Sequence, residues 1–262
     1  MPGVVFVMID GLRPDALAAA RCPNLESVRA RGASTLRARS VMPSVTLPCH
    51  MSIFHSVPPT RHGVTTNEFT PMARPIPGLI ERLKAHDRRA AFFYNWEPLR
   101  NLSLPGSLFS SFFRDVHPDD LVDSDQLIAD TAARTIAVDK LDFAFVYFGV
   151  VDLAGHFYGW MSDDYLKQAE RADAALGTVL AALPADAAVI VHSDHGGHDR
   201  NHGTELPEDM TIPWMAAEPG IRAGYDIAGP VSLLDTAPTV ARLLGLPPHP
   251  EWEGRVIEEM LE

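Results

Sequence analysis

Short apolar runs alternate with stretches of helical spacing along most of the chain. Val4–Ile9 is a continuous apolar run of strand length, which is typical of a strand buried on both faces of a sheet. Pro23–Arg31 follows with the spacing of a helix and is closed by Gly32. The pattern predicts further strands at Ser34–Val41, Ala90–Tyr94, Phe143–Val151, Ala187–Val191 and Ile212–Ala217, and further helices at Pro75–His86, Ser124–Asp139, Asp164–Leu183 and Ser232–Leu244.

This alternation of strands and helices predicts a doubly wound α/β sandwich. Residues 97–120 break the pattern, because they are irregular and rich in Ser, Pro and Phe, and we expect them to form a surface excursion beside a pocket. No internal repeat, low-complexity segment or linker divides the sequence. We therefore expect residues 1–262 to form a single domain.

The composition excludes several classes of protein. Hydrophobic residues make up 46% of the chain, which is enough for a folded core and excludes a disordered protein. No run approaches the ~20 apolar residues of a membrane helix, and the net charge of −12 disfavours a nucleic acid polymer as a partner. Cys22 and Cys49 do not indicate a disulfide framework, and the run at Val4–Ile9 is too short for a signal peptide. We therefore expect a cytoplasmic protein without a membrane partner.

Acidic and histidine residues follow the ends of several predicted strands. The carboxyl ends of the strands of an open α/β sheet are where ligands bind. One such aspartate alone would be a helix cap or a turn residue, and one histidine alone a surface or hydrogen-bonded residue. Together, at one edge of the sheet, they suit two divalent cations. The residues are Asp10, Asp152, His156, Asp194, His195 and His202.

Thr46 and Asn67 are candidates for contact with a substrate. Thr46 lies just before an apolar helical stretch, where a threonine is ordinarily an N-cap. Beside two metal ions the same position has a second use, because a helix N-terminus and a metal both stabilise an alkoxide. Asn67 could donate its side-chain amide to a substrate oxygen, although alone it would be a turn residue.

Several short motifs follow one another in a fixed order. They are Ile9-Asp10-Gly11-Leu12-Arg13, Thr46-x-Pro-x-His50, His62-Gly63 followed by Asn67, Asp152-x-x-Gly155-His156, Ser193-Asp194-His195-Gly196-Gly197, His202-Gly203, Ile212-Pro213-Trp214 and Asp235-Thr236-Ala237-Pro238-Thr239. In this order they resemble the alkaline phosphatase superfamily, and most of all its nucleotide pyrophosphatase/phosphodiesterase branch. The resemblance runs from residue 4 to about residue 255. It implies an alkaline-phosphatase-like three-layer α/β/α sandwich around a central, mostly parallel sheet.

The resemblance also implies two zinc ions and a threonine nucleophile, Thr46. Carried over position by position, one metal takes Asp152, His156 and His202. The other metal takes Asp10, Thr46, Asp194 and His195. Asn67 then holds the non-bridging phosphate oxygens. The same mixed ligands also suit Mn²⁺ or Fe.

These residues predict a dimetal hydrolase that cleaves phosphodiester bonds of nucleotides or other small phosphodiesters through a covalent phospho-threonine intermediate. The alternative is a phosphomonoesterase, for which Arg13, Arg61 or Arg100 would meet the extra charge. A sulfatase is disfavoured, because sulfatases of this superfamily use a modified Cys or Ser where this chain has Thr46. A non-catalytic metal-binding protein would have no need of that threonine. The expected partner is a small phosphate ester, and the sequence does not indicate an oligomeric state.

Other residues near these motifs receive ordinary roles. His192 and His198 do not match the ligand positions and are expected to be structural. Cys49 is expected to be a buried small residue, and His50 to pack behind Thr46. The family's large insertions between the metal motifs are missing, so any cap is expected to be small, with residues 95–120 and 158–165 as its candidates.

Overall fold

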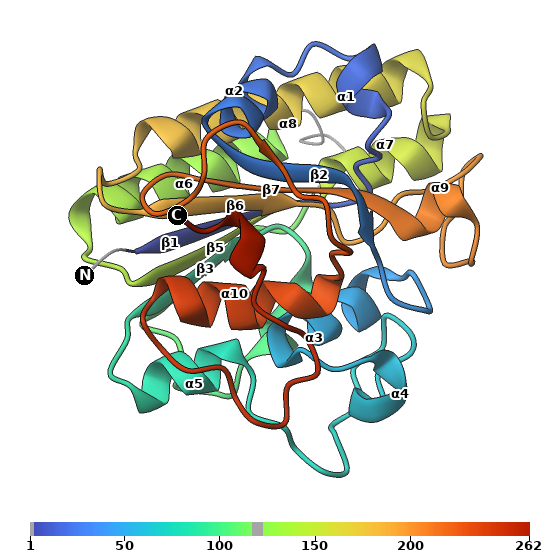
Figure 1. The fold of residues 1–262 in the computed structure, drawn as a ribbon. Coiled ribbons are helices and arrows are strands. Elements are labelled where there is room, and N and C mark those ends of the chain that lie inside the picture. The colour runs from blue at the N-terminus through green and yellow to red at the C-terminus, as the bar shows by residue number, and fades with distance from the viewer. Residues whose placement is uncertain (1–2, 117–122) are drawn as a thin grey trace.

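A single mixed sheet organises the part of the chain that the computed structural model describes, residues 3–116 and 123–262 (Figure 1). Its eight strands have the order β4-β3-β5-β1-β6-β7-β2-β8. Neighbouring strands are parallel, except that β7 is antiparallel to both β6 and β2. The prediction of a central, mostly parallel sheet is confirmed. The strands are β1 Val4–Ile9, β2 Gly32–Arg39, β3 Ala90–Tyr94, β4 Ser110–Phe113, β5 Phe143–Phe148, β6 Ala188–His192, β7 Thr211–Ala217 and β8 Tyr225–Asp226.

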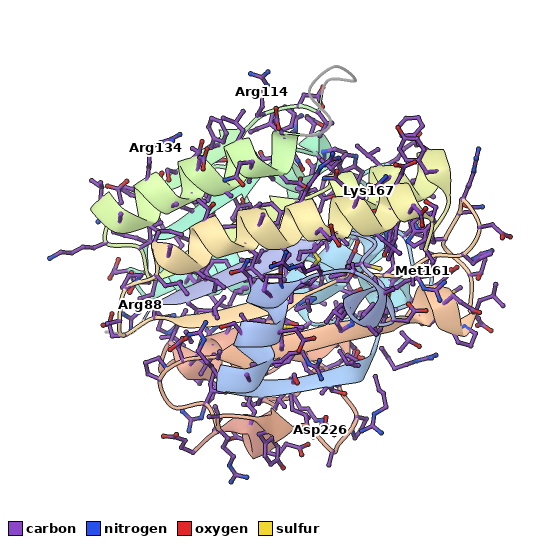
Figure 2. The ribbon with its side chains drawn as sticks, turned by 90° about the horizontal axis from the view of Figure 1, so that it is seen from above. Arg88, Arg114, Arg134, Met161, Lys167 and Asp226 are labelled. Carbon is purple, nitrogen blue, oxygen red and sulfur yellow. The ribbon has the colours of Figure 1, made fainter. Side chains whose placement is uncertain are left out.

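Helices cover both faces of the sheet and complete the three layers (Figure 1). Alternate residues of β1 pack into two different cores: Val5 and Val7 share one with α2, α6 and α8, and Phe6 and Met8 share the other with α3, α5 and α10. Figure 2 shows α6 and α8 side by side on the first of these faces, with α2 next to α8. The helices are α1 Ala16–Ala19, α2 Pro23–Arg31, α3 Thr46–His55, α4 Pro59–His62, α5 Leu79–Ala85, α6 Ser124–Val138, α7 Val150–Tyr158, α8 Asp163–Ala181, α9 Pro207–Met210 and α10 Thr236–Leu243.

The apolar run predicted as one strand at Phe143–Val151 is in fact a strand followed by a helix. Strand β5 ends at Phe148, and α7 begins at Val150 after Gly149. Gly149 gives no side-chain cap, so the sequence carries no polar signal for the start of this helix. The boundary matters because it places Asp152 in the first turn of α7.

Some irregular segments differ from the predictions. Residues 97–120 contain a 3₁₀ helix, η1 Glu97–Leu102, and β4, which pairs only with β3; residues 117–122 lie outside the described part. The helix predicted from Pro75 starts only at α5, where Gly78 and Glu81 form the N-terminal cap. The helix predicted from Ser232 is divided into the 3₁₀ helix η3 Leu233–Asp235 and α10.

The register of the central strands brings the site together. Strand β1 lies between β5 and β6, with Ile9 opposite Phe148 and Met8 opposite His192. The segments that leave these three parallel strands therefore emerge side by side at one edge. Asp10 follows β1, Asp152 follows β5 and Asp194 follows β6.

Candidate dimetal site

The structure gathers the six predicted aspartates and histidines into two clusters. Within each cluster, one ligand atom from every residue lies within 4.8 Å of the others. The stacked rings of His195 and His202, with centroids 3.8 Å apart, join the two clusters. Apart from Thr46, each cluster contains the residues of one implied ligand set, and metal binding by them stays a prediction. One consists of Asp152, His156 and His202, and the other of Asp10, Asp194 and His195.

The backbone around Asp10 fits closely against α7. Gly11 has a φ of +69°, and a Cβ built on it would lie 3.0 Å from Asp152 Cα. Only glycine combines this left-handed conformation with so close an approach. Asp152 and His156 lie one turn apart on α7, so both side chains occupy the same side of the helix.

Backbone carbonyls fix the orientation of the three histidines. The Nδ1 atom of His195 donates to Gly196 O over 2.8 Å, and that of His202 donates to Ser44 O over 2.8 Å. His156 Nδ1 makes the same kind of bond to Arg200 O over 3.0 Å. Because Nδ1 carries the proton in each ring, Nε2 keeps a free lone pair. This nitrogen faces the carboxylates. This tautomer is the one a metal-binding histidine needs.

Each of the three carboxylates has an oxygen that suits a cation. Asp10 Oδ1, Asp152 Oδ1 and Asp194 Oδ2 are buried and have no hydrogen-bond partner among the described residues. Their nearest basic atoms are histidine nitrogens, with Asp10 Oδ1 3.3 Å and Asp194 Oδ2 3.4 Å from His195 Nε2. Buried anionic oxygens without a partner are costly unless a cation binds them. The residues therefore fit a pair of divalent cations.

The pKa shifts of the site residues also favour bound cations. Burial, reinforced by neighbouring carboxylates, raises the pKa of Asp10 and Asp152 well above the ordinary carboxyl range. Burial raises the pKa of Asp194 to about 7. Burial and the nearby His195 lower the pKa of His202 to about 2, so His202 stays neutral at pH 7. The neutral ring of His202 does not balance the negative charge of the carboxylates, whereas bound cations would balance it.

The hydroxyl group of Thr46 points toward the site and does not cap its own helix. Val45 is the N-cap of α3, and its apolar side chain makes no capping hydrogen bond. Thr46 is buried, with Oγ1 3.3 Å from His195 Nε2. Behind it, His50 Nδ1 donates to Thr46 O over 2.7 Å. The ordinary interpretation of Thr46 as an N-cap does not hold here.

Asn67 approaches the same helix end. Its side-chain Oδ1 accepts a hydrogen bond from Leu47 N over 3.0 Å, so it satisfies one of the free amides of the first turn of α3. The amide nitrogen Nδ2 takes no part in this contact. Asn67 thus contacts Leu47, the residue that follows Thr46, and its contact with a substrate stays a prediction.

Tyr147 is a site neighbour that the sequence pattern did not single out. It lies in β5, is buried, and donates a hydrogen bond from its phenol to Asp10 Oδ2. Burial and the charge of Asp10 raise the pKa of Tyr147 well above its usual range, so the phenol keeps its proton. An aromatic residue in a buried strand resembles any other core residue, so the sequence pattern does not distinguish Tyr147 from its neighbours.

The other neighbours have the ordinary roles expected for them. His192 bonds Ser193 O and Thr236 Oγ1, and His198 bonds Asp209 Oδ1 over 2.8 Å. Asp209 also accepts from Thr204 N and Oγ1, which ties together the loop that carries His202. Cys49 is buried, and its Sγ contacts Ser40 Oγ.

All three arginines considered for a second phosphate charge have acidic partners elsewhere. Arg13 pairs with Asp15 and also donates to Gly197 O. The other two pairs lie on the protein surface: Arg61 contacts Glu251 and Glu253, and Arg100 contacts Glu97.

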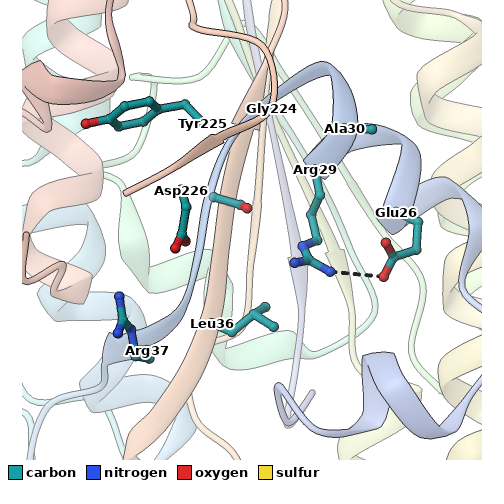
Figure 3. Close-up of a pocket in the computed structure, with 9 residues that line it drawn as sticks. Glu26, Arg29, Ala30, Leu36, Arg37, Gly224, Tyr225 and Asp226 are labelled. Atoms are coloured by element: carbon teal, nitrogen blue, oxygen red, sulfur yellow. Dashed lines mark hydrogen bonds and ion pairs between the residues drawn. The ribbon is translucent and has the colours of Figure 1, made fainter. Parts of the chain in front are cut away.

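A separate hollow of about 480 Å³ lies at the β8 edge of the sheet (Figure 3). It is lined by residues of α2, β2 and β8, among them Arg29, which pairs with Glu26 over 3.1 Å. None of the predicted site residues lines it. The cavity therefore belongs to another part of the surface.

The chain has an α/β fold, and the family match and the relatives place it in the alkaline phosphatase superfamily. The family model for type I phosphodiesterase / nucleotide pyrophosphatase matches residues 4–99 and 79–214, which is more than half of the chain. The protein belongs to this family.

Curated relatives share only part of their length with the chain. The 2,3-bisphosphoglycerate-independent phosphoglycerate mutase of Cellvibrio japonicus is 31% identical over 133 residues, which cover 49% of this chain and 25% of the mutase. The phosphopentomutase of Symbiobacterium thermophilum is 30% identical over 112 residues, which cover 42% of this chain and 28% of that enzyme. The chain thus matches about a quarter of these relatives.

Solved structures share the whole fold at low identity. Murine ectonucleotide pyrophosphatase / phosphodiesterase 5, an inactive variant in complex with AMP, superposes with a TM-score of 0.82 at 15% identity and covers 100% of both chains. The phosphonate monoester hydrolase of Agrobacterium radiobacter gives a TM-score of 0.79 at 18% identity, covering 100% of this chain and 77% of that one. Among the residues that the structure describes, no helix has the length and apolar character needed to cross a membrane.

Proposed function

We propose that the protein is a dimetal phosphodiesterase that cleaves small phosphodiesters, including those of nucleotides, through a covalent phospho-threonine intermediate on Thr46. The observation that carries this proposal is the position of Thr46 Oγ1. It lies 3.3 Å from His195 Nε2, at the N-terminus of α3, beside the stacked pair of histidines that joins the two clusters. A threonine needed only for structure would cap the helix.

The two clusters divide the metal ligands. Asp152, His156 and His202 would hold one ion, and Asp10, Asp194 and His195 would hold the other. Thr46 would join the second set of ligands, as the resemblance implies. This mixture of carboxylates and imidazoles suits Zn²⁺ best, with Mn²⁺ or Fe as alternatives. When bound, the ions supply positive charge that favours ionisation of Thr46 and stabilises the transferring phosphoryl group. We propose that one catalytic domain with a small cap carries this site.

The reaction is then a double displacement at phosphorus. Thr46 Oγ1 loses its proton to solvent and bonds to phosphorus while the bond from phosphorus to the leaving oxygen breaks, and the leaving alkoxide takes up a proton. The side chain of Asn67 holds the non-bridging oxygens. Water then attacks phosphorus, the bond to Oγ1 breaks, and Oγ1 regains a proton as the phosphomonoester leaves.

The charges around the site favour a diester over a monoester. A monoester brings an extra negative charge, and Arg13, Arg61 and Arg100 are all paired with acidic residues elsewhere. Thr46 in place of a modified Cys or Ser disfavours sulfate esters. The substrate class is therefore a singly charged phosphodiester.

A comparison of three substrates tests this function. We expect protein with two metal ions per chain to hydrolyse bis(p-nitrophenyl) phosphate well above p-nitrophenyl phosphate, and both above p-nitrophenyl sulfate. A preference for p-nitrophenyl phosphate would support the monoesterase instead. Full metal content with no hydrolysis of any of the three esters would contradict the enzymatic role.

A further inference from the structure

Tyr147 and Asp10 lie on neighbouring strands and face the same side of the sheet. Tyr147 of β5 is directly opposite Met8 of β1, and Asp10 comes two residues after Met8. Side chains that are two residues out of register on adjacent strands lie on the same face and reach each other. The phenol of Tyr147 uses this position to donate to Asp10 Oδ2.

Because of this hydrogen bond, the two oxygens of the Asp10 carboxylate have different surroundings. Oδ2 accepts from Tyr147, whereas Oδ1 has no hydrogen-bond partner in the described part of the chain and lies 3.3 Å from His195 Nε2. Asp194 is arranged in the same way, with Oδ1 3.4 Å from Gly11 N and Oδ2 open. In this cluster, each carboxylate presents one oxygen.

Among the described residues, no comparable donor binds the carboxylate of the other cluster. Asp152 Oδ1 has no hydrogen-bond partner among the described residues, and its nearest nitrogen is His202 Nε2 at 3.7 Å. Asp152 Oδ2 lies 3.4 Å from His156 Nε2. Both of these nitrogens are expected ligand atoms. The orientation of Asp152 is therefore left to the metal, whereas the orientation of Asp10 is fixed by the protein.

Packing holds the phenol of Tyr147 where it is. The ring of His50 meets it edge-on, with centroids 5.4 Å apart. On another side, a Cβ added to Gly149 would lie 2.8 Å from Tyr147 Cε1 and 3.2 Å from its hydroxyl oxygen. With little room to turn, the hydroxyl stays on Asp10.

We propose that Tyr147 is a positioning residue: it turns Asp10 so that only Oδ1 is offered to the metal, and so strengthens binding of the ion held by Asp10, Asp194 and His195. It does this without touching the substrate. The inference rests on the proposed function, because it assumes that the two clusters bind metal. Hydrogen-bond partners of metal ligands typically contribute 10–100-fold in metal affinity.

The test is a titration of metal-free protein with Co²⁺, followed by its visible absorption. We expect Tyr147→Phe to bind one of the two ions about 10–100-fold more weakly and to change the absorption of that ion alone. Asp152→Asn identifies the ions, because it should lose the one that Tyr147→Phe retains. Activity lost by Tyr147→Phe at limiting metal should return at saturating metal, with the KM for bis(p-nitrophenyl) phosphate unchanged.

Tyr225→Phe is the matched control, since Tyr225 also donates from its phenol to a carboxylate, that of Glu259, but on the β8 edge. It should bind both ions as the wild type does. Wild-type affinities and spectra for Tyr147→Phe, or equal weakening of both ions, would overturn the inference while leaving the proposed function intact. A wild-type protein that binds no Co²⁺ would overturn both.

Discussion

The imidazole ring of His195 stacks on that of His202, with the ring planes 12° apart and the centroids separated by 3.8 Å. These two residues belong to different ligand clusters, so the stack ties the position of one cluster to that of the other. Thr46 Oγ1 lies beside His195. The expected consequence is that loss of either ion disturbs the nucleophile as well as its own cluster.

Removal of a ligand should therefore remove an ion. Asp152→Asn and His202→Ala each take away one of the ligands of the same cluster, and we expect each variant to retain about one ion per chain instead of two. Metal analysis after gel filtration measures this. His86→Ala is the control, because His86 is exposed and its Nδ1 bonds only to Arg82 O of its own helix end. Two full ions in Asp152→Asn would refute its role as a ligand.

Chelation should destabilise the folded protein. Three buried carboxylates lose their counter-charges when the ions leave, and a ligand present at a thousand times its Kd contributes about 4 kcal/mol to stability. We expect the melting temperature to fall on treatment with a chelator and to recover when Zn²⁺ is added back, as measured by calorimetry. An unchanged melting temperature would show that the clusters do not hold metal.

Much of the site could be predicted from the sequence because its residues follow strand ends. Asp10 and Asp194 come after apolar runs that had to be buried strands, and a parallel sheet brings such ends together. The start of α7 could not be predicted, since Gly149 provides no polar cap. The role of Tyr147 could not be predicted either, because it depends on a register between β5 and β1 that a single strand does not reveal.

The two edge strands of the sheet could not be predicted from the sequence either. Strand β4 alternates between half-buried and exposed residues and pairs only with β3, so its Ser-Ser-Phe-Phe sequence has no strong strand pattern. Strand β8 has two residues and takes its place from pairing with Ala33 and Ser34. Edge strands of this kind depend on tertiary contacts more than on local propensity.

Asp125 should give stability a measurable pH dependence. It is buried in α6, where Asn95 Nδ2 donates to its Oδ1, and burial raises its pKa to about 7 from an ordinary 3.8. A raised carboxyl pKa contributes stability that is fully present below about pH 4 and is lost as the pH rises through about 7.

We therefore expect Asp125→Asn to become more stable relative to wild type as the pH rises from 4 to 8. Urea unfolding at several pH values measures the difference, with Asp130→Asn of the same helix as control. A difference in stability between Asp125→Asn and wild type that does not vary with pH would contradict this assignment.

Asn67 should act on substrate binding without affecting the metals. In Asn67→Asp the side chain can still accept from Leu47 N, but it loses the amide nitrogen and gains a negative charge near the phosphate. We expect kcat/KM for bis(p-nitrophenyl) phosphate to fall about 10–100-fold, the size of one or two lost charge-assisted hydrogen bonds, with two ions still bound. If Asn67→Asp keeps the wild-type kcat/KM, Asn67 serves only to cap α3.

Thr46 is the proposed nucleophile of a dimetal phosphodiesterase. The most direct test of this role is the turnover of bis(p-nitrophenyl) phosphate by Thr46→Ala, measured on protein whose metal content is known. We predict that turnover falls by several orders of magnitude, as expected on loss of a nucleophile, while the variant keeps about two ions per chain. Turnover near the wild-type rate in Thr46→Ala would show that Thr46 is not the nucleophile.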